Sequence, residues 1–272
     1  MFLFQVTYAQ SNATANSLEI ALNQVGSDEE RLKITLQLSE EFYKTNPSLA
    51  LKYARESERL AKNIHSNSSL NNAYVNQATA YLHMGNYPQA LQLYFKAIDG
   101  AGKLDDSYTL FLAYEKLGIL YPYQKNNKKA LEYYFAALNQ FSRKKPNSKK
   151  QIERKAYLLK NIGVAYNETK RYTESANYFN QALSLSKQLN DHELIANILN
   201  NQGTLYRDLG NNQLALKQYK EAMEIRRENN NKWGLSSSYL NIGQFYFDQK
   251  DYAIAETYLK EAIELGKQIE YW

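Results

Sequence analysis

The chain has 272 residues, of which 44% are hydrophobic, and a formal net charge of +5. This length and apolar content suffice for one large folded domain or two smaller ones, which excludes a disordered chain. The sequence contains no Cys, which excludes a disulfide framework, a thiol nucleophile and Cys-ligated zinc. Basic and acidic side chains alternate along most of the chain, as on solvated helix surfaces, so the charge does not indicate a nucleic-acid partner.

The N-terminal segment, MFLFQVTYAQ, is a short apolar run that ends in Thr7, Tyr8 and Ala9. Small residues three positions before and directly before a cut after Ala9 resemble the end of a secretory signal, although no basic segment precedes the run. We therefore interpret residues 1–10 as a signal-peptide remnant or leader. This predicts a periplasmic or extracellular location, with a cytoplasmic location as the alternative. No apolar run reaches the roughly 18 residues of a transmembrane helix.

Only 11 Gly and 4 Pro are present, which favours long helices, and one pattern recurs five times after residue 70. Its small residue is followed three positions later by Tyr, in the pairs Ala78–Tyr81, Gly118–Tyr121, Gly163–Tyr166, Gly203–Tyr206 and Gly243–Tyr246. Twelve residues after the small position stand Ala90, Ala130, Ser175, Ala215 and Ala255, followed by Tyr94, Tyr134, Phe179, Tyr219 and Leu259, and then by Ala97, Ala137, Ala182, Ala222 and Ala262. These spacings of four and three mark one face of a second helix.

The pattern resembles the tetratricopeptide repeat, a helical hairpin with a small residue, Tyr, Ala, an aromatic residue and Ala in this order. The steps between small residues are 40, 45, 40 and 40, longer than the about 34 residues of the best-known form. The resemblance implies an all-α solenoid, a right-handed superhelix of about six hairpins in a single domain over residues 11–272. The hairpins are expected at about residues 28–66, 71–104, 109–142, 150–189, 194–229 and 234–270.

The first of these hairpins is a weaker copy that keeps Ser39, Phe42, Ala50 and Ala54. In the stronger copies, Gly85 and Gly210 stand where the first helix should end, because Gly adopts the left-handed conformation without steric cost. Lys125, Lys170 and Lys250 occupy the same place in three other copies. The basic segment SRKKPNSKK, residues 142–150, reads as a loop between the third and fourth hairpins, since Pro146 interrupts a helix.

No set of residues indicates catalysis. The three His residues, His65, His83 and His192, are far apart and lack metal-ligand spacing. The GAGKL sequence at residues 100–104 lacks the first Gly and the Ser or Thr of a phosphate loop, so it reads as a helix end. The sequence therefore predicts a protein that is not an enzyme and needs no cofactor or metal.

A candidate ligand site follows from the register of the repeats. Two residues before the small position stand Asn76, Lys116, Asn161, Asn201 and Asn241. The resemblance implies that first helices line a concave face on which Asn here contacts peptide main chain; the alternative interpretation is that Asn is only a consensus residue of the repeat. The fourth to sixth hairpins add further polar residues to this predicted site: Lys160, Asn197, Asn200, Thr204, Arg207, Asp208 and Gln244.

The leading hypothesis is a non-catalytic module that recognises a protein or peptide ligand, similar to the sensor regions of bacterial signalling proteins. Tyr271 and Trp272 follow a second helix without a polar cap, which predicts association through the C-terminal end. A cytoplasmic scaffold or peptide-responsive regulator of the same resembling family is the alternative. Nucleic-acid binding is a remote alternative, because no repeated base-reading code is evident.

Overall fold

The computed structural model describes residues 14–143 and 148–270, and all regular structure in these ranges is α-helical. The chain divides into two compact units with the boundary at Asn147, called here the first unit (residues 14–143) and the second unit (residues 148–270). None of the helices in the described ranges is long and apolar enough to cross a membrane. The predicted leader at residues 1–10 and the terminal pair Tyr271 and Trp272 lie outside the described residues.

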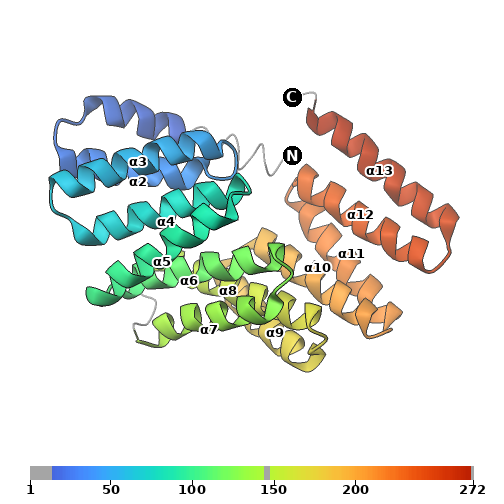
Figure 1. Cartoon of the computed structure of the whole chain (residues 1–272). Helices are drawn as coiled ribbons and strands as arrows, with labels where there is room; N and C mark the ends of the chain where they lie inside the picture. Colours follow the sequence, from blue (N-terminus) through green and yellow to red (C-terminus); the bar gives the residue numbers. More distant parts are fainter. Residues whose placement is uncertain (1–13, 144–147, 271–272) are drawn as a thin grey trace. The chain divides into compact units, whose positions relative to one another are not determined.

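The first unit opens with a helix over residues 14–24 and continues with three hairpins (Figure 1). These hairpins are α2 (Asp28–Phe42) with α3 (Pro47–Asn63), α4 (Asn67–His83) with α5 (Tyr87–Lys103), and α6 (Ser107–Tyr123) with α7 (Asn127–Arg143). The helix at 14–24 was not expected as a separate element. Its apolar Leu18, Ala21 and Leu22 follow helical spacing.

The second unit is also built of three hairpins (Figure 1). They are α8 (Lys149–Glu168) with α9 (Tyr172–Leu189), α10 (His192–Asp208) with α11 (Asn212–Glu228), and α12 (Lys232–Asp248) with α13 (Tyr252–Glu270). The predicted all-α repeat fold is therefore confirmed. A single superhelix over residues 11–272 concerns both units together and stays a prediction.

Sharp turns join the two helices of each hairpin. Gly85 and Gly210 both have φ of 75°, and Lys125, Lys170 and Lys250 adopt the same left-handed region with φ of 56°, 59° and 65°. The predicted helix ends are confirmed, including those that use Lys in place of Gly. A side chain with a Cβ atom costs about 1–2 kcal/mol in this conformation, so three turns carry a strain that the two Gly turns avoid.

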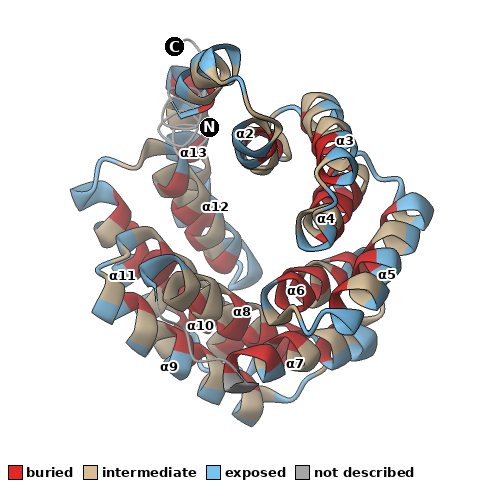
Figure 2. Ribbon diagram, turned by 90° about the vertical axis from the view of Figure 1, so that its left-hand side faces the viewer, coloured by how far each residue is buried: buried red, intermediate tan, exposed pale blue. Residues whose placement is uncertain are grey.

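In three hairpins, α6–α7, α8–α9 and α10–α11, the core holds an aromatic ring packed on a glycine. A Cβ atom added to Gly118 would lie 2.3 Å from the ring of Tyr134, and one added to Gly163 would lie 2.6 Å from Phe179. The equivalent ring of the next hairpin, Tyr219, lies 2.6 Å from a Cβ added to Gly203 and also contacts Phe245 of the following hairpin, with ring centroids 6.2 Å apart. Only a missing Cβ allows such close approach of the two helices. Figure 2 shows the buried residues concentrated where helices of a unit face each other.

A second contact explains the Tyr that follows the small residue by three positions. In three hairpins it stacks on a Tyr of the second helix: Tyr121 on Tyr133 with centroids 5.2 Å apart, Tyr166 on Tyr178 at 5.5 Å, and Tyr246 on Tyr258 at 5.9 Å. Offset aromatic pairs add to the stability that area burial provides. The recurring Tyr therefore adds a second contact between the two helices of these hairpins, besides the packing at the small residue.

The weaker first copy, α2 with α3, uses a hydrogen bond where four of the other hairpins have Gly and α4–α5 has Ala78. Ser39 is 1% exposed, and its Oγ donates to the carbonyl oxygen of Ala50 at 2.9 Å. Ala50 and Ala54 are fully buried, and Phe42 stacks on Tyr53 at 6.0 Å. Small residues thus allow close helix approach here as well.

We expect Gly118→Ala to lower the free energy of unfolding by about 1–3 kcal/mol, because the new methyl group overlaps the buried Tyr134 ring. Gly266→Ala in α13 is the matched control, since a Cβ there meets no atom within 4 Å. This control should stabilise the helix by up to about 1 kcal/mol. Urea unfolding followed by circular dichroism measures both variants. Equal effects of the two substitutions would contradict the packing role of Gly118.

Candidate functional site

The first helices of the second unit, α8, α10 and α12, form the surface that we call the first-helix face. Two hydrogen bonds and an ion pair link residues of successive first helices that lie about one repeat apart in the sequence. Asn167 Nδ2 donates to Asp208 Oδ2 at 2.7 Å, and Arg207 Nη1 lies 3.7 Å from Asp248 Oδ2. Asn241 Nδ2 donates to Asn200 Oδ1 at 2.8 Å. Residues separated by one repeat therefore lie side by side on this face.

Three of the predicted Asn residues share one register position on this face, Asn161 on α8, Asn201 on α10 and Asn241 on α12. All three are half-buried. Asn241 reaches back to Asn200, whereas the amide groups of Asn161 and Asn201 form no hydrogen bond within the described part of the chain. Each free amide offers two donors and an acceptor, so this row can bind the N–H and C=O groups of an extended chain.

The other residues predicted on this face have partners within the unit. Lys160 Nζ lies 5.3 Å from the centroid of the Tyr157 ring. The hydroxyl groups of Thr204 and Tyr219 share a hydrogen bond of 3.1 Å. Gln244 Nε2 donates to Asp248 Oδ1 at 2.7 Å. Because these side chains have partners within the unit, we place them at the edge of the Asn row and not within it.

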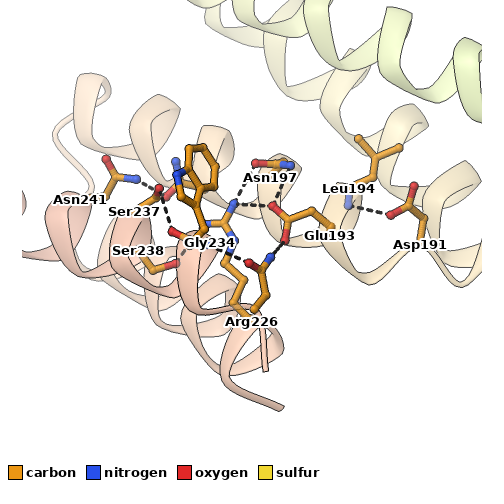
Figure 3. Close-up of polar contacts among 12 residues, drawn as sticks. Asp191, Glu193, Leu194, Asn197, Arg226, Gly234, Ser237, Ser238 and Asn241 are labelled. Carbon is orange, nitrogen blue, oxygen red and sulfur yellow. Dashed lines mark hydrogen bonds and ion pairs between the residues drawn. The ribbon is translucent and has the colours of Figure 1, made fainter. Parts of the chain in front are cut away.

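A buried arginine lies beneath the face and joins α10, α11 and α12 (Figure 3). Arg226 on α11 is 3% exposed. Its Nη2 donates to Glu193 Oε1 at 3.0 Å and to Asn197 Oδ1 at 2.8 Å, and its Nη1 donates to Ser238 Oγ at 3.0 Å. Asn197 Nδ2 also donates to Glu193 Oε1, at 3.1 Å. Asn197, predicted as a ligand residue, thus has both ends of its amide engaged.

Sequence reasoning missed Arg226, although the register carried a signal. The corresponding residues of four other hairpins are Ala101, Phe141, Ser186 and Gly266, so Arg226 is the only charged residue in this column. Gly234 on α12 makes room for it, because a Cβ there would lie 2.8 Å from Arg226 Nε. A charge in a column of small and apolar residues, with Gly opposite, indicates a buried ion pair.

The electrostatics of this cluster are finely balanced. Burial raises the pKa of Glu193, while Arg226 and the Asn231 amide, whose Nδ2 donates to Glu193 Oε2, act in the opposite direction. The guanidinium stays charged at any ordinary pH. Removing either partner of such a pair leaves the other charge buried without compensation, which costs about 3–5 kcal/mol.

In the first unit the corresponding positions are used differently. Asn76 is 6% exposed, and its Nδ2 donates to the Leu36 carbonyl oxygen at 3.1 Å. Its amide therefore joins α4 to α2, and a ligand role for Asn76 stays a prediction.

The ring of His83, at the end of α4, lies 4.9 Å from that of Tyr43. His83 is exposed on the surface, and the partial burial of its ring, together with Lys116 and Lys44, lowers its pKa to about 4.

Nowhere in residues 14–143 and 148–270 do three His, Asp or Glu side chains gather as metal ligands would.

We expect Arg226→Ala to lower the free energy of unfolding by about 3–5 kcal/mol, because Glu193 loses its buried partner. Arg227→Ala is the matched control on the same helix, since its ion pair with Glu224 is half-exposed and contributes about 0–1 kcal/mol. Urea unfolding compares the two. Similar losses for both variants would show that the buried pair has no special role.

We expect the His83 imidazole to remain neutral until the pH approaches about 4. Lys44→Gln should move the midpoint upward, because it removes a nearby positive charge. NMR titration of the imidazole protons measures the midpoint directly. A midpoint near 6.5, the ordinary value for His, would contradict the described environment.

Comparison with known proteins extends these observations. Tetratricopeptide repeat models match residues 69–142, 154–228 and 235–269. No curated protein matches the sequence. The crystal structure of BtubC (BKLC) from P. vanneervenii is similar with a TM-score of 0.65 at 22% identity, covering 86% of this chain and 93% of that chain.

Two further solved structures share the fold at low identity. A Rap protein complexed with competence and sporulation factor has a TM-score of 0.72 at 13% identity, covering 100% of this chain and 74% of that chain. The apo form of the quorum sensor NprR from B. thuringiensis has a TM-score of 0.61 at 15% identity, covering 96% of this chain and 84% of that chain. Since the repeat models match well over half of its residues, the chain belongs to the tetratricopeptide repeat family.

Proposed function

We propose that this protein is a non-catalytic recognition module whose first-helix face binds an extended peptide. The observation that carries this proposal is the pair of half-buried amides without hydrogen bonds, Asn161 and Asn201, one on each of two adjacent first helices. Neither amide is among the polar groups buried without a partner in the described residues, so both stay open to water and to a ligand. A ligand that binds them replaces water and breaks no hydrogen bond within the protein.

The chemistry of amides favours main chain over side chains as the recognised group. An Asn side chain matches the donor and acceptor pattern of a peptide bond. Asn161 and Asn201 occupy equivalent positions one repeat apart, and Arg207 and Asp248 on neighbouring helices add charges of both signs. Main-chain bonds would supply affinity, and these charges would select among side chains.

Similar folds support a role in signalling. One similar structure is a Rap protein in complex with competence and sporulation factor, and another is a quorum sensor. We therefore propose that the protein is the sensor or scaffold region of a bacterial signalling system, with a peptide-responsive cytoplasmic regulator as the second candidate. An export signal at residues 1–10 distinguishes the two and stays a prediction.

Selection from a random hexapeptide library on the immobilised full chain tests the proposal. We expect enriched peptides whose affinity falls at least about tenfold in the Asn161→Ala/Asn201→Ala variant, the loss expected for two hydrogen bonds. Asn177→Ala is the matched control, because Asn177 is exposed on the second helix α9. Failure to enrich any peptide, or equal binding by the double variant, would exclude this site.

A further inference from the structure

A groove in the first unit lies between the helix at residues 14–24, α2 and α3. It has a volume of about 680 Å³. Arg31, Lys52, Arg55 and Arg59 line it together with one acidic residue, Glu56. The lining therefore carries three more positive than negative side chains. Volumes of about 300–1,000 Å³ are those of small-molecule sites.

Most of these cations lack an acidic partner. Arg59 Nη2 pairs with Glu56 Oε1 at 2.7 Å. Arg31 and Arg55 instead bind neutral acceptors, the Leu22 carbonyl oxygen at 3.3 Å and the Tyr81 hydroxyl at 2.9 Å. Lys52 is exposed and has no hydrogen bond or ion pair among the described residues.

Two exposed lysines of the first unit are paired with an acid on their own helix. Lys62 pairs with Glu58 at 2.7 Å, and Lys103 pairs with Asp99 at 2.6 Å, each one helical turn away on the same helix. The groove, in contrast, is lined by four positively charged side chains and one carboxylate, that of Glu56. The mutual repulsion of the positive side chains is unfavourable, and an anion bound among them would relieve it.

The nearest further acid does not neutralise the groove. Glu19 Oε1 accepts a hydrogen bond from the Tyr53 hydroxyl at 2.7 Å, and Tyr53 lines the groove. Burial and Glu19 raise the pKa of Tyr53 to about 12, so this phenol is protonated at neutral pH. Glu19 adds a second carboxylate beside the groove, so the four cations still outnumber the two acids.

We propose that this groove is a binding site for a small phosphate-bearing molecule. Guanidinium groups bind phosphate through two parallel N–H···O bonds, which makes arginine the preferred side chain for this recognition. Three of the four cations in the groove are arginines. The site is separate from the first-helix face of the second unit and does not depend on peptide binding.

Isothermal titration of the full chain with inorganic pyrophosphate in 50 mM salt tests the proposal. We expect saturable binding of one equivalent that weakens at least tenfold in Arg31→Gln/Arg55→Gln. We expect a marked loss in Arg31→Lys/Arg55→Lys as well, because lysine keeps the charge but not the paired bonds. Lys217→Gln/Lys220→Gln on α11 removes the same charge from an exposed surface and should bind as the unmodified chain does.

Thermal unfolding with and without pyrophosphate gives a second readout. A ligand that binds only the folded state raises the unfolding temperature, so pyrophosphate should stabilise the unmodified chain and the Lys217/Lys220 control. The Arg31→Gln/Arg55→Gln variant should unfold cooperatively with no such rise. Absence of saturable binding, unchanged binding in this variant, or equally tight binding of citrate would overturn the assignment of a phosphate site.

Discussion

The fold depends on close approach of the two helices of a hairpin, which in three hairpins is the packing of an aromatic ring on the bare backbone of a glycine. In the α6–α7 hairpin this is Tyr134 on Gly118, and in α8–α9 it is Phe179 on Gly163. The contact lets the helices approach closely and buries the ring almost completely. Because it lies within a hairpin, each hairpin is a structural unit in its own right. Stacking of hairpins then buries the apolar surface that each one leaves exposed.

Departures from this repeated core mark the places where the chain is specialised. Arg226 replaces a small or apolar residue and requires Gly234 on the next hairpin, Glu193 on the paired helix and Ser238 on α12. Such a cluster is no general source of stability, since apolar packing of the same volume often serves as well. Its hydrogen bonds have strict geometry, so they fix how α12 sits on α10 and α11 beneath the Asn row.

The repeat could be predicted from sequence because small residues and aromatics recur at fixed spacings. The same spacings located the helix ends at Gly85 and Gly210, and Lys125 showed that position can outweigh residue preference. The register also placed Asn161 and Asn201 on equivalent sites. It could not show which amides have internal partners, because this depends on side-chain reach between helices. The sequence predicts a ligand role for both Asn197 and Asn161. Of the two, only Asn197 forms hydrogen bonds within the described residues through both the oxygen and the nitrogen of its amide.

The links between first helices have an energetic consequence of their own. On the first-helix face, α8 is joined to α10 by the Asn167–Asp208 bond, and α10 to α12 by Arg207–Asp248 and Asn241–Asn200. On the other side, α11 and α12 share a buried apolar cluster that includes Tyr219 and Phe245. A polar link in contact with water contributes only about 1 kcal/mol, far less than an apolar core. Beneath the face, the buried Arg226 cluster joins α10 to α12. Thermal fluctuation therefore opens the exposed links more readily than the buried ones, and the face can loosen while its supporting core stays packed.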